Sequence, residues 1–335
     1  MGNKCLYCYQ DIDEGDFHQN CSKKIFGAFP APELPYTRDT MQDLAKEIIQ
    51  HSVSVPGVQA KLSLHLFSGE RGHPPRFTLV GLWGNYILKP PVTAYPGMVE
   101  IEDCTMHLAE LFHLSVVPHS LIRLAPQAEP GRGELAYITR RIDRAIDRKI
   151  NHKTDRSNTA APRIHMEDFC QLSGKLTEDK YRGSLESCVR LIRRHSSNTL
   201  LDILAFFEIS VFSFLTGNGD MHLKNFSLIY NENGMVSLTP AYDLLATRLL
   251  ISEKHDPEEF ALTMNGKKRN FTLNDFIKFG TGSGLSPKQM ENCFTKFSRS
   301  LDKAALLIED SFIAEPLKAE YRVLIEARGR RLGLR

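Results

Sequence analysis

The sequence has little net charge and no conspicuously long apolar stretch. Its 42 lysines and arginines nearly balance 40 aspartates and glutamates, for a net charge of +2. A protein that binds a polyanion through its overall charge is thereby excluded, and we expect no direct nucleic-acid binding. We find neither a secretory signal pattern nor an apolar run long enough to cross a bilayer, so we expect a cytoplasmic protein without membrane contact.

Cysteine is scarce and odd in number. Four of the seven cysteines lie in helical apolar patterns, where a small buried thiol is the ordinary outcome: Cys104, Cys170, Cys188 and Cys293. The other three accompany a histidine near the N-terminus. Their spacing, Cys-x2-Cys followed by His-x2-Cys, makes Cys5, Cys8, His18 and Cys21 a candidate tetrahedral set for a structural zinc ion. A reduced, metal-free N-terminal arm is the alternative that the sequence leaves open.

The most informative segment, residues 217–226, reads Gly-Asn-Gly-Asp-Met-His-Leu-Lys-Asn-Phe, and Ala-Tyr-Asp follows at residues 241–243. It contains an Asp-x4-Asn pair, Asp220 and Asn225, with a second aspartate, Asp243, further on. In kinase-like enzymes the first aspartate of such a set accepts the proton of the attacking hydroxyl, and the other two residues hold magnesium. Magnesium requires hard oxygen ligands, which carboxylate and amide groups supply.

An Asp-x4-Asn pair alone is common in turns, so the assignment depends on the neighbouring sequence. Residues 200–215 form a strongly apolar helical run that stops at Gly217, which places Asp220 in a loop after a buried helix. Residues 226–230 and 236–240 alternate like the strands of a hairpin around Asn-Glu-Asn-Gly. This order of elements is typical of a kinase catalytic loop: a helix, a polar loop, a hairpin and then a metal-binding aspartate.

Three upstream segments are candidates for nucleotide binding. Lys89 ends a short apolar strand, as expected for the strand lysine that contacts the phosphates. Residues 52–61 precede an alternating strand, but they contain no G-x-G-x-x-G pattern and only Gly57 gives special backbone freedom. Residues 134–143 occupy the place of a hinge strand that bonds adenine through its backbone. Besides Lys89, the candidate ATP-binding residues are Val55, Gly57, Val58, Gln59, Lys61, Thr139, Arg140, Ile142 and Asp143.

Amphipathic helices are predicted after the lysine strand and in the C-terminal half. The first, over residues 99–114, lies where kinases carry the glutamate that pairs with the lysine, and Glu100, Glu102 and Glu110 are all available for that role. Further helices are predicted over residues 185–195, 286–307 and 319–332, and loops over residues 248–268 and 280–284.

Six motifs, in order, resemble those of the HipA family of serine/threonine kinase toxins. They are Ser-Val-Pro-Gly-Val-Gln-Ala-Lys (54–61), Ile-Leu-Lys-Pro (87–90), Ile-Thr-Arg-Arg-Ile-Asp-Arg (138–144), Met-Glu-Asp-Phe-Cys-Gln (166–171), Gly-Asn-Gly-Asp-Met-His-Leu-Lys-Asn-Phe-Ser (217–227) and Pro-Ala-Tyr-Asp (240–243). The resemblance runs from about residue 52 to the C-terminus. It implies ATP and Mg²⁺ as cofactors, Asp220 as catalytic base, Asn225 and Asp243 as magnesium ligands, Lys89 as the phosphate contact, and His222 and Lys224 as residues that shape the loop or touch phosphate.

The resemblance also implies regulation and partners. Ser52 and Ser54 match serines whose autophosphorylation ejects the nucleotide-covering loop, and a phosphate there adds roughly −1.5 to −2 charges. The core motifs begin almost at once, which is similar to the short form, HipT. In that form the N-terminal subdomain of the long members is a separate HipS-like antitoxin, and a HipB-like helix-turn-helix protein completes the complex. The expected substrate is an aminoacyl-tRNA synthetase, tryptophanyl for short forms or glutamyl for long ones.

We therefore expect an α+β, bilobal, protein-kinase-like fold with a small sheet-rich N-lobe and a larger helical C-lobe. The predicted domains are an N-terminal arm with the candidate zinc knuckle (residues 1–50), the N-lobe (51–145) and the C-lobe (146–335). The boundary between the lobes is expected near residues 144–165, with a flexible segment in the polar stretch over residues 143–164. Because Asp-x-His-x2-Asn also resembles the catalytic loop of aminoglycoside and choline kinases, a small-molecule kinase stays open. A non-catalytic pseudokinase adaptor is the third alternative.

Overall fold

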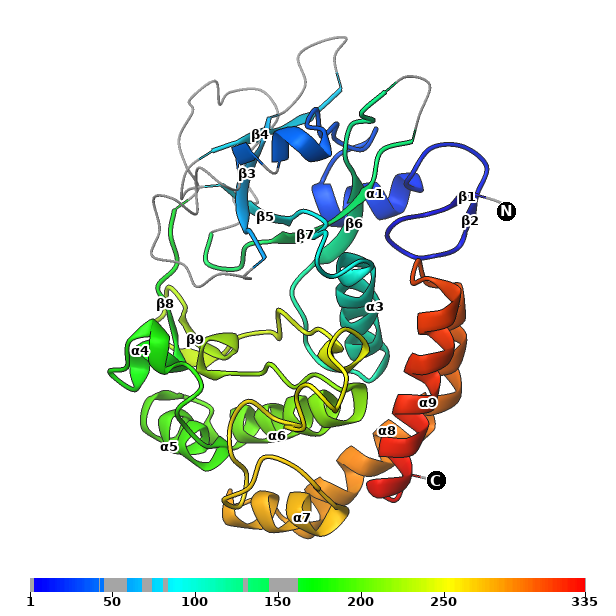
Figure 1. Ribbon diagram of the computed structural model, residues 1–335. Helices are drawn as coiled ribbons and strands as arrows, with labels where there is room; N and C mark the ends of the chain where they lie inside the picture. The colour runs from blue at the N-terminus through cyan, green and yellow to red at the C-terminus, as the bar shows by residue number, and fades with distance from the viewer. Residues whose placement is uncertain are drawn as a thin grey trace. The chain divides into compact units, whose positions relative to one another are not determined.

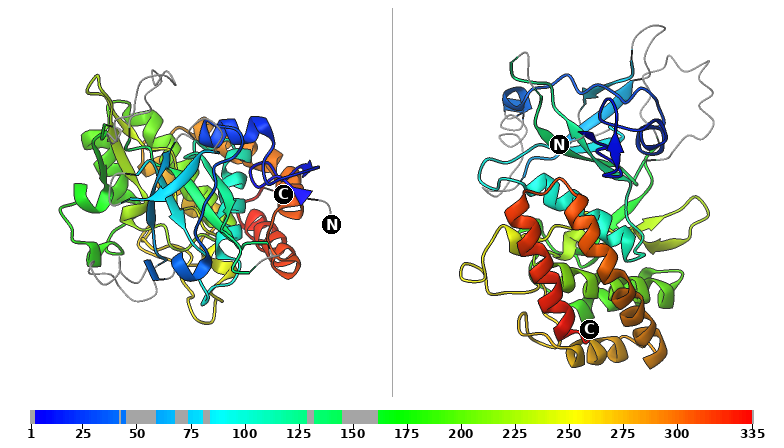
Figure 2. Two further views of the ribbon diagram at one scale, coloured as in Figure 1. Left: turned by 90° about the horizontal axis from the view of Figure 1, so that it is seen from above. Right: turned by 90° about the vertical axis from the view of Figure 1, so that its right-hand side faces the viewer.

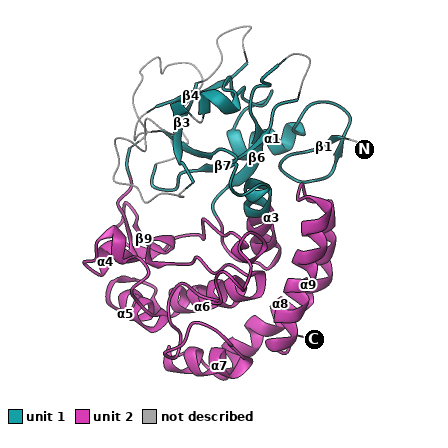
Figure 3. Cartoon of the chain, viewed as in Figure 1, with its two compact units in different colours: residues 1–103, 117–163 teal, residues 104–116, 164–335 magenta. Residues whose placement is uncertain are grey.

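The computed structural model describes residues 3–41, 43–44, 59–67, 74–80, 84–128, 132–144 and 162–334. The chain divides into two compact units (Figure 3): unit 1 comprises residues 1–103 and 117–163, and unit 2 comprises residues 104–116 and 164–335. Five residues with predicted roles lie outside the described ranges, as does most of the predicted flexible segment. They are Ser52, Ser54, Val55, Gly57 and Val58.

Unit 1 is built on a five-stranded sheet with strand order β4-β3-β5-β7-β6 (Figures 1 and 2). Its strands are β3 (Leu62–Phe67), β4 (Arg76–Leu79), β5 (Tyr86–Lys89), β6 (His119–Arg123) and β7 (Leu135–Arg140). All four neighbouring pairs are antiparallel. Because β5 is paired on both sides, Lys89 at its end stands on a strand that the sheet holds in place, opposite Tyr137 of β7.

An N-terminal segment packs on this sheet. Strands β1 (Asn3–Lys4) and β2 (Asp11–Ile12) form an antiparallel pair, and helix α1 (Gln19–Phe26) follows. Phe26 meets Phe77 of β4 edge to face, with ring centroids 5.7 Å apart. Helix α3 (Met98–Leu111) starts in unit 1 and continues into unit 2.

Unit 2 is mainly helical and is centred on helix α6 (Thr199–Thr216), whose four phenylalanines are all fully buried. Besides the C-terminal part of α3, its other α-helices are α4 (Phe169–Leu172), α5 (Leu185–His195), α7 (Leu273–Gly282), α8 (Pro287–Asp310) and α9 (Glu315–Arg331). A three-stranded antiparallel sheet of order β10-β9-β8 contains β8 (Met166–Asp168), β9 (Ser227–Tyr230) and β10 (Val236–Leu238). The predicted hairpin is therefore β9 and β10, and helices mixed with antiparallel sheets confirm the α+β class.

Helix α6 corrects one expectation. The sequence predicts no apolar run long enough to cross a bilayer, yet α6, at 18 residues, is long and apolar enough by length and composition. Within the fold, 67% of these residues are buried, and Asp202 in its first turn accepts hydrogen bonds from Ser196 and from the backbone of Leu238. The apolar length of α6 therefore serves the core of unit 2.

The predicted loop at residues 280–284 was partly wrong, because α7 extends to Gly282. Gly280 is buried, and a Cβ at that position would collide with Met290 and press on Phe207. The glycine that suggested a loop instead allows α7 to approach its neighbours closely.

Candidate functional site

The loop after α6 positions Asp220. Helix α6 ends at Thr216 and is capped by Gly217, which has a left-handed backbone with φ of 76°. Thr247 holds the loop through two hydrogen bonds. Its hydroxyl accepts one from the Gly219 amide (2.9 Å) and donates one to the Gly217 carbonyl (3.3 Å). Asp220 is an exposed residue of this restrained loop.

Asn225 is tied directly to the loop that carries Asp220. It closes the short 3₁₀ turn η2 (Leu223–Asn225), is 8% exposed, and donates from Nδ2 to the backbone carbonyl of Asp220 at 2.9 Å. Because the amide nitrogen is used in this way, the amide oxygen is the end of the side chain suited to a hard cation. The Asp220 carboxylate and the Asn225 oxygen thus belong to one hydrogen-bonded loop.

Tyr181 contacts the predicted base. Its hydroxyl donates a 2.8 Å hydrogen bond to Oδ1 of Asp220, and its ring lies edge-on to the buried His222 at 5.2 Å between centroids. Burial, and then the negative charge of Asp220, raise the pKa of Tyr181 well above its usual range. Tyr181 therefore stays a protonated donor at neutral pH.

Asp243 has an unusual backbone. Its φ of 55° lies in the left-handed region that non-glycine residues seldom adopt, although aspartate tolerates it better than most. The preceding residue holds it in place, because the Tyr242 hydroxyl donates to the Lys224 carbonyl (3.1 Å) and lies 2.6 Å from Ser227 Oγ. Strained backbone conformations cluster at active sites and ligand-binding positions, which favours a functional role for Asp243.

Lys224 shapes the loop in this structure. Its ammonium group forms a 2.8 Å ion pair with Asp168, and the other carboxylate oxygen of Asp168 caps α4 through the Gln171 amide. The pair ties the loop that carries Asp220 to the start of α4. His222, predicted to share this role, is 6% exposed beneath the Tyr181 ring.

In unit 1 the structure selects one glutamate as the partner of Lys89. Lys89 Nζ donates to Oε1 of Glu102, and the two side chains are 5% and 1% exposed. The ammonium also lies 5.3 Å from the centroid of the Tyr137 ring. Of the alternatives, Glu110 is exposed, and burial raises the pKa of Glu100.

Two of the remaining residues predicted to bind ATP form hydrogen bonds within the protein. Gln59 donates to the Pro90 carbonyl at 3.1 Å, and the Thr139 hydroxyl donates to the Pro118 carbonyl at 3.0 Å. Lys61 precedes β3, Arg140 ends β7, and Ile142 follows it, half-buried. Because β7 is paired with both β5 and β6, its own backbone groups are largely used within the sheet. Backbone recognition of adenine would therefore fall to the residues after β7.

Asp143, in the turn that follows β7, forms ion pairs with two guanidinium groups. It pairs with Arg141 at 2.7 Å and with Arg144 at 2.8 Å. Burial opposes ionisation of this carboxyl, but the hydrogen bond and charge of Arg141, together with Arg144, prevail and lower its pKa. The Asp143 side chain thus braces the turn after β7.

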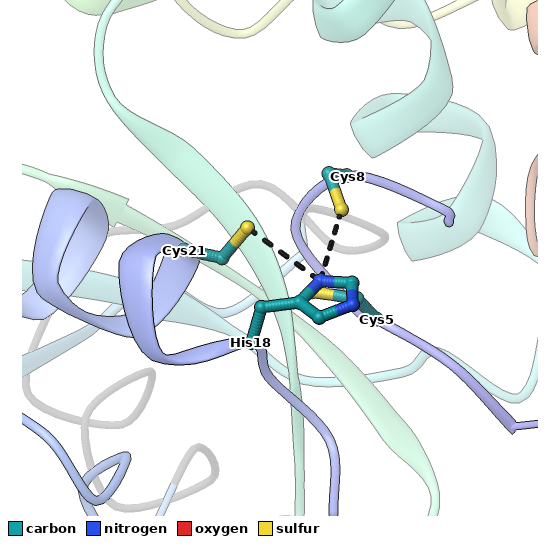
Figure 4. A group of neighbouring side chains, drawn as sticks. All are labelled: Cys5, Cys8, His18 and Cys21. Carbon is teal, nitrogen blue, oxygen red and sulfur yellow. Dashed lines mark hydrogen bonds between the residues drawn. The ribbon is translucent and has the colours of Figure 1, made fainter. Parts of the chain in front are cut away.

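The N-terminal cysteines and histidine come together in unit 1 (Figure 4). The ligand atoms of Cys5, Cys8, His18 and Cys21 all lie within 4.8 Å of one another. Burial opposes ionisation of Cys5, but backbone hydrogen bonds from His18, Tyr7 and Cys8 lower the pKa of its thiol. By contrast, burial raises the pKa of Cys21 to about 12. Sequence spacing alone predicted this grouping.

Comparison with known families supplies the assignment. The model of the HipA-like C-terminal domain matches residues 53–305, which is most of the chain. The chain belongs to the HipA-like C-terminal domain family. The resemblance inferred from the six motifs is thereby confirmed.

Relatives of this HipA-like chain are named as kinases. "Putative kinase Y4mE" of Sinorhizobium fredii is 35% identical over 199 residues, covering 58% of this chain and 42% of that protein. A "Putative kinase" of Haemophilus influenzae is 28% identical over 301 residues, covering 85% and 83%. The "Serine/threonine-protein kinase toxin HipA" of Shewanella oneidensis is 26% identical over 268 residues, covering 75% and 56%. The chain thus spans about half the length of Y4mE and of HipA.

Solved structures agree on the fold. A chain of the Shewanella oneidensis complex of HipA, HipB and operator DNA gives a TM-score of 0.67 at 22% identity, covering 92% of this chain and 74% of that one. The Helicobacter pylori proinflammatory kinase CtkA gives 0.50 at 16% identity, covering 73% and 86%. The predicted kinase-like fold is confirmed.

Sequence reasoning missed four residues that organise the HipA-like loop: Asp168, Tyr181, Tyr242 and Thr247. Asp168 and Tyr242 lie inside motifs that carried the resemblance, next to residues that received roles. Tyr181 and Thr247 belong to no motif, and they reach the loop only through the fold. An Asp-x2-Gln capping pattern at residues 168–171 was the one local signal available for this group.

Proposed function

We propose that this HipA-like chain is an ATP-dependent serine/threonine protein kinase. The observation that carries the proposal is the single hydrogen-bonded assembly in unit 2. There, Asn225 bonds to the Asp220 backbone, and the hydroxyl of Tyr242, the residue before the strained Asp243, donates to the Lys224 carbonyl. The kinase names of its relatives support the same activity.

The donor set fits the cofactors expected for this reaction. Asn225 and Asp243 would hold Mg²⁺ through amide and carboxylate oxygens, and Lys89, oriented by Glu102, would contact the ATP phosphates. When bound, magnesium neutralises charge on the phosphates of the nucleotide. Asp220 would orient the substrate hydroxyl and accept its proton, and its exposure leaves it open to a protein side chain. Tyr181 and Lys224 would keep the loop in the productive position.

Regulation and partners follow from the family as part of the proposal. We propose a toxin of the short, HipT-like form, neutralised by a HipS-like protein and a HipB-like DNA-binding protein, and self-inactivated by phosphorylation of Ser52 or Ser54. A relative's solved complex contains HipB and operator DNA, which supports a partner of that kind. The proposed substrate is a serine of an aminoacyl-tRNA synthetase, tryptophanyl or glutamyl.

One experiment tests the activity and the substrate class together. Purified protein is incubated with γ-labelled ATP, magnesium and cell lysate, and labelled proteins are identified by mass spectrometry. The proposal expects label in the kinase itself and in one dominant lysate protein, and Asp220→Asn should abolish both without changing the circular dichroism spectrum. Label found only in small molecules would establish a metabolite kinase instead. No binding of Mg-ATP would indicate a pseudokinase.

A further inference from the structure

The cysteine–histidine cluster is assembled from two turns of the N-terminal segment. Cys5 and Cys8 lie in the loop between β1 and β2, where the Cys5 amide donates to the Gln10 carbonyl at 2.8 Å. His18 is the N-cap residue of α1, and Cys21 lies in its first turn. Figure 4 shows the sulfur atoms of Cys8 and Cys21 turned toward one ring nitrogen of His18, with Cys5 next to the ring.

The separations match one tetrahedral ion. His18 Nδ1 lies 3.4 Å from Cys8 Sγ and 3.9 Å from Cys21 Sγ. With Zn–S bonds of about 2.3 Å and Zn–N bonds of about 2.0–2.1 Å, a sulfur and a nitrogen on one zinc lie roughly 3.5 Å apart. The two observed distances fall on either side of this value.

The second nitrogen of His18 has the partner that a metal-bound histidine needs. Nε2 lies 3.0 Å from the Asp11 carbonyl oxygen, which can only accept, so Nε2 is the donor. In the neutral ring this hydrogen bond leaves the Nδ1 lone pair directed at the sulfurs. A disulfide between two of the cysteines would explain neither the third sulfur nor this orientation.

The segment around the cluster reaches Asp103, the residue next to Glu102, which pairs with Lys89. Tyr9, directly after Cys8, has a left-handed backbone with φ of 63°, which is rare for a bulky side chain. Its buried hydroxyl donates a 2.6 Å hydrogen bond to Asp103 of α3, the neighbour of Glu102. On the sheet side, Arg123 of β6 pairs with Asp16 at 3.1 Å. A cross-link within so short a segment would stabilise this conformation by restricting the unfolded chain.

We propose that Cys5, Cys8, His18 and Cys21 bind one structural Zn²⁺, and that this ion holds residues 3–26 against the five-stranded sheet and the start of α3. The ion stabilises the segment and takes no part in phosphoryl transfer. The proposal stands independently of the kinase activity.

Metal content gives the first test. Untagged protein purified without added metal is analysed by elemental mass spectrometry, with Cys8→Ser and His18→Asn as ligand variants. Cys293→Ser and His113→Asn, outside the cluster, are the matched controls. We expect one zinc per chain in wild type and controls, and loss of zinc in both ligand variants. Replacement by Co²⁺ should give the visible and near-ultraviolet bands of tetrahedral thiolate coordination. Metal-free wild type that takes up neither Zn²⁺ nor Co²⁺ would overturn the site.

Hydrogen exchange tests the role of the ion. Removal of zinc should speed exchange of peptides covering residues 3–26 and 98–103 on the order of tenfold, and should leave peptides of α8 unchanged. Tyr9→Phe should keep one zinc and speed exchange only at residues 98–103. Zinc-free protein with wild-type exchange in both regions would show that the ion does not hold the segment.

Discussion

The buried pair of Lys89 and Glu102 allows stability and catalysis to be separated. Both side chains are almost completely removed from water, at 5% and 1% exposed. Removing one charge therefore takes the ion-pair partner from the other buried charge, and such a loss typically costs roughly 3–5 kcal/mol. We expect Lys89→Met and Glu102→Leu each to lower the free energy of unfolding by about this amount.

The double variant Lys89→Met/Glu102→Leu removes both charges and keeps similar side-chain volumes. Since apolar replacements of a buried pair are often neutral, its free energy of unfolding should lie within about 1 kcal/mol of wild type. It should nevertheless transfer no phosphate, because the proposed phosphate contact is gone. Urea unfolding followed by circular dichroism measures the stabilities, and labelled ATP measures transfer. Glu110→Gln, an exposed glutamate on the same helix, is the control and should change stability by less than about 0.5 kcal/mol.

Two results would refute this reasoning. If the costs of the single variants simply add in the double variant, the two charges do not stabilise each other, and the coupling argument fails. If the double variant folds and still transfers phosphate at the wild-type rate, Lys89 is not the phosphate contact.

Three further predictions concern unit 2. Asp168→Asn keeps an N-cap on α4 but loses the charge that binds Lys224, so we expect a several-fold lower kcat at unchanged thermal stability. Gly217→Ala places a Cβ at a left-handed position against Leu324, and should lower the free energy of unfolding by at least about 1 kcal/mol in urea melts. Glu259 is buried, yet its hydrogen bond and charge pairing with Arg331 lower its pKa below 4.5. Arg331→Ala should therefore cost about 2 kcal/mol at pH 7, and its free energy of unfolding should approach that of wild type as the pH falls below 4.5.

The sequence predicted correctly those helices and strands that are specified by residues within or next to them. The predicted helix over residues 185–195 coincides with α5, because Ser184 and Ser187 form a capping box at its start. The strand that ends at Lys89 and the hairpin after Asn225 were likewise confirmed by β5, β9 and β10. In each case the residues that specify the element lie inside it or beside it.

Contacts between residues far apart in the chain could not be predicted from the sequence. Glu100, Glu102 and Glu110 all lie on the same predicted helix, and only the rotation of α3 against the sheet brings Glu102 to Lys89. Tyr181 lies 39 positions from Asp220, and Asp168 lies 56 positions from Lys224. No local pattern encodes such contacts, because they depend on how separate elements pack.

A strained backbone conformation occurs at each of the two proposed sites. Among the described residues, five that are not glycine have positive φ: Tyr9, His113, Asp243, Asn265 and Asn270. The asparagines adopt this conformation at low cost, whereas a bulky tyrosine does not. At both Tyr9 and Asp243 a tyrosine hydroxyl anchors the strained turn, through Asp103 in the first case and through the Lys224 carbonyl in the second. A strained backbone conformation persists only where contacts with the surrounding structure outweigh the local preference of the residue. At Asp243 the proposed gain is a metal-binding carboxylate held beside the catalytic loop, and at Tyr9 it is a zinc-braced contact next to Glu102.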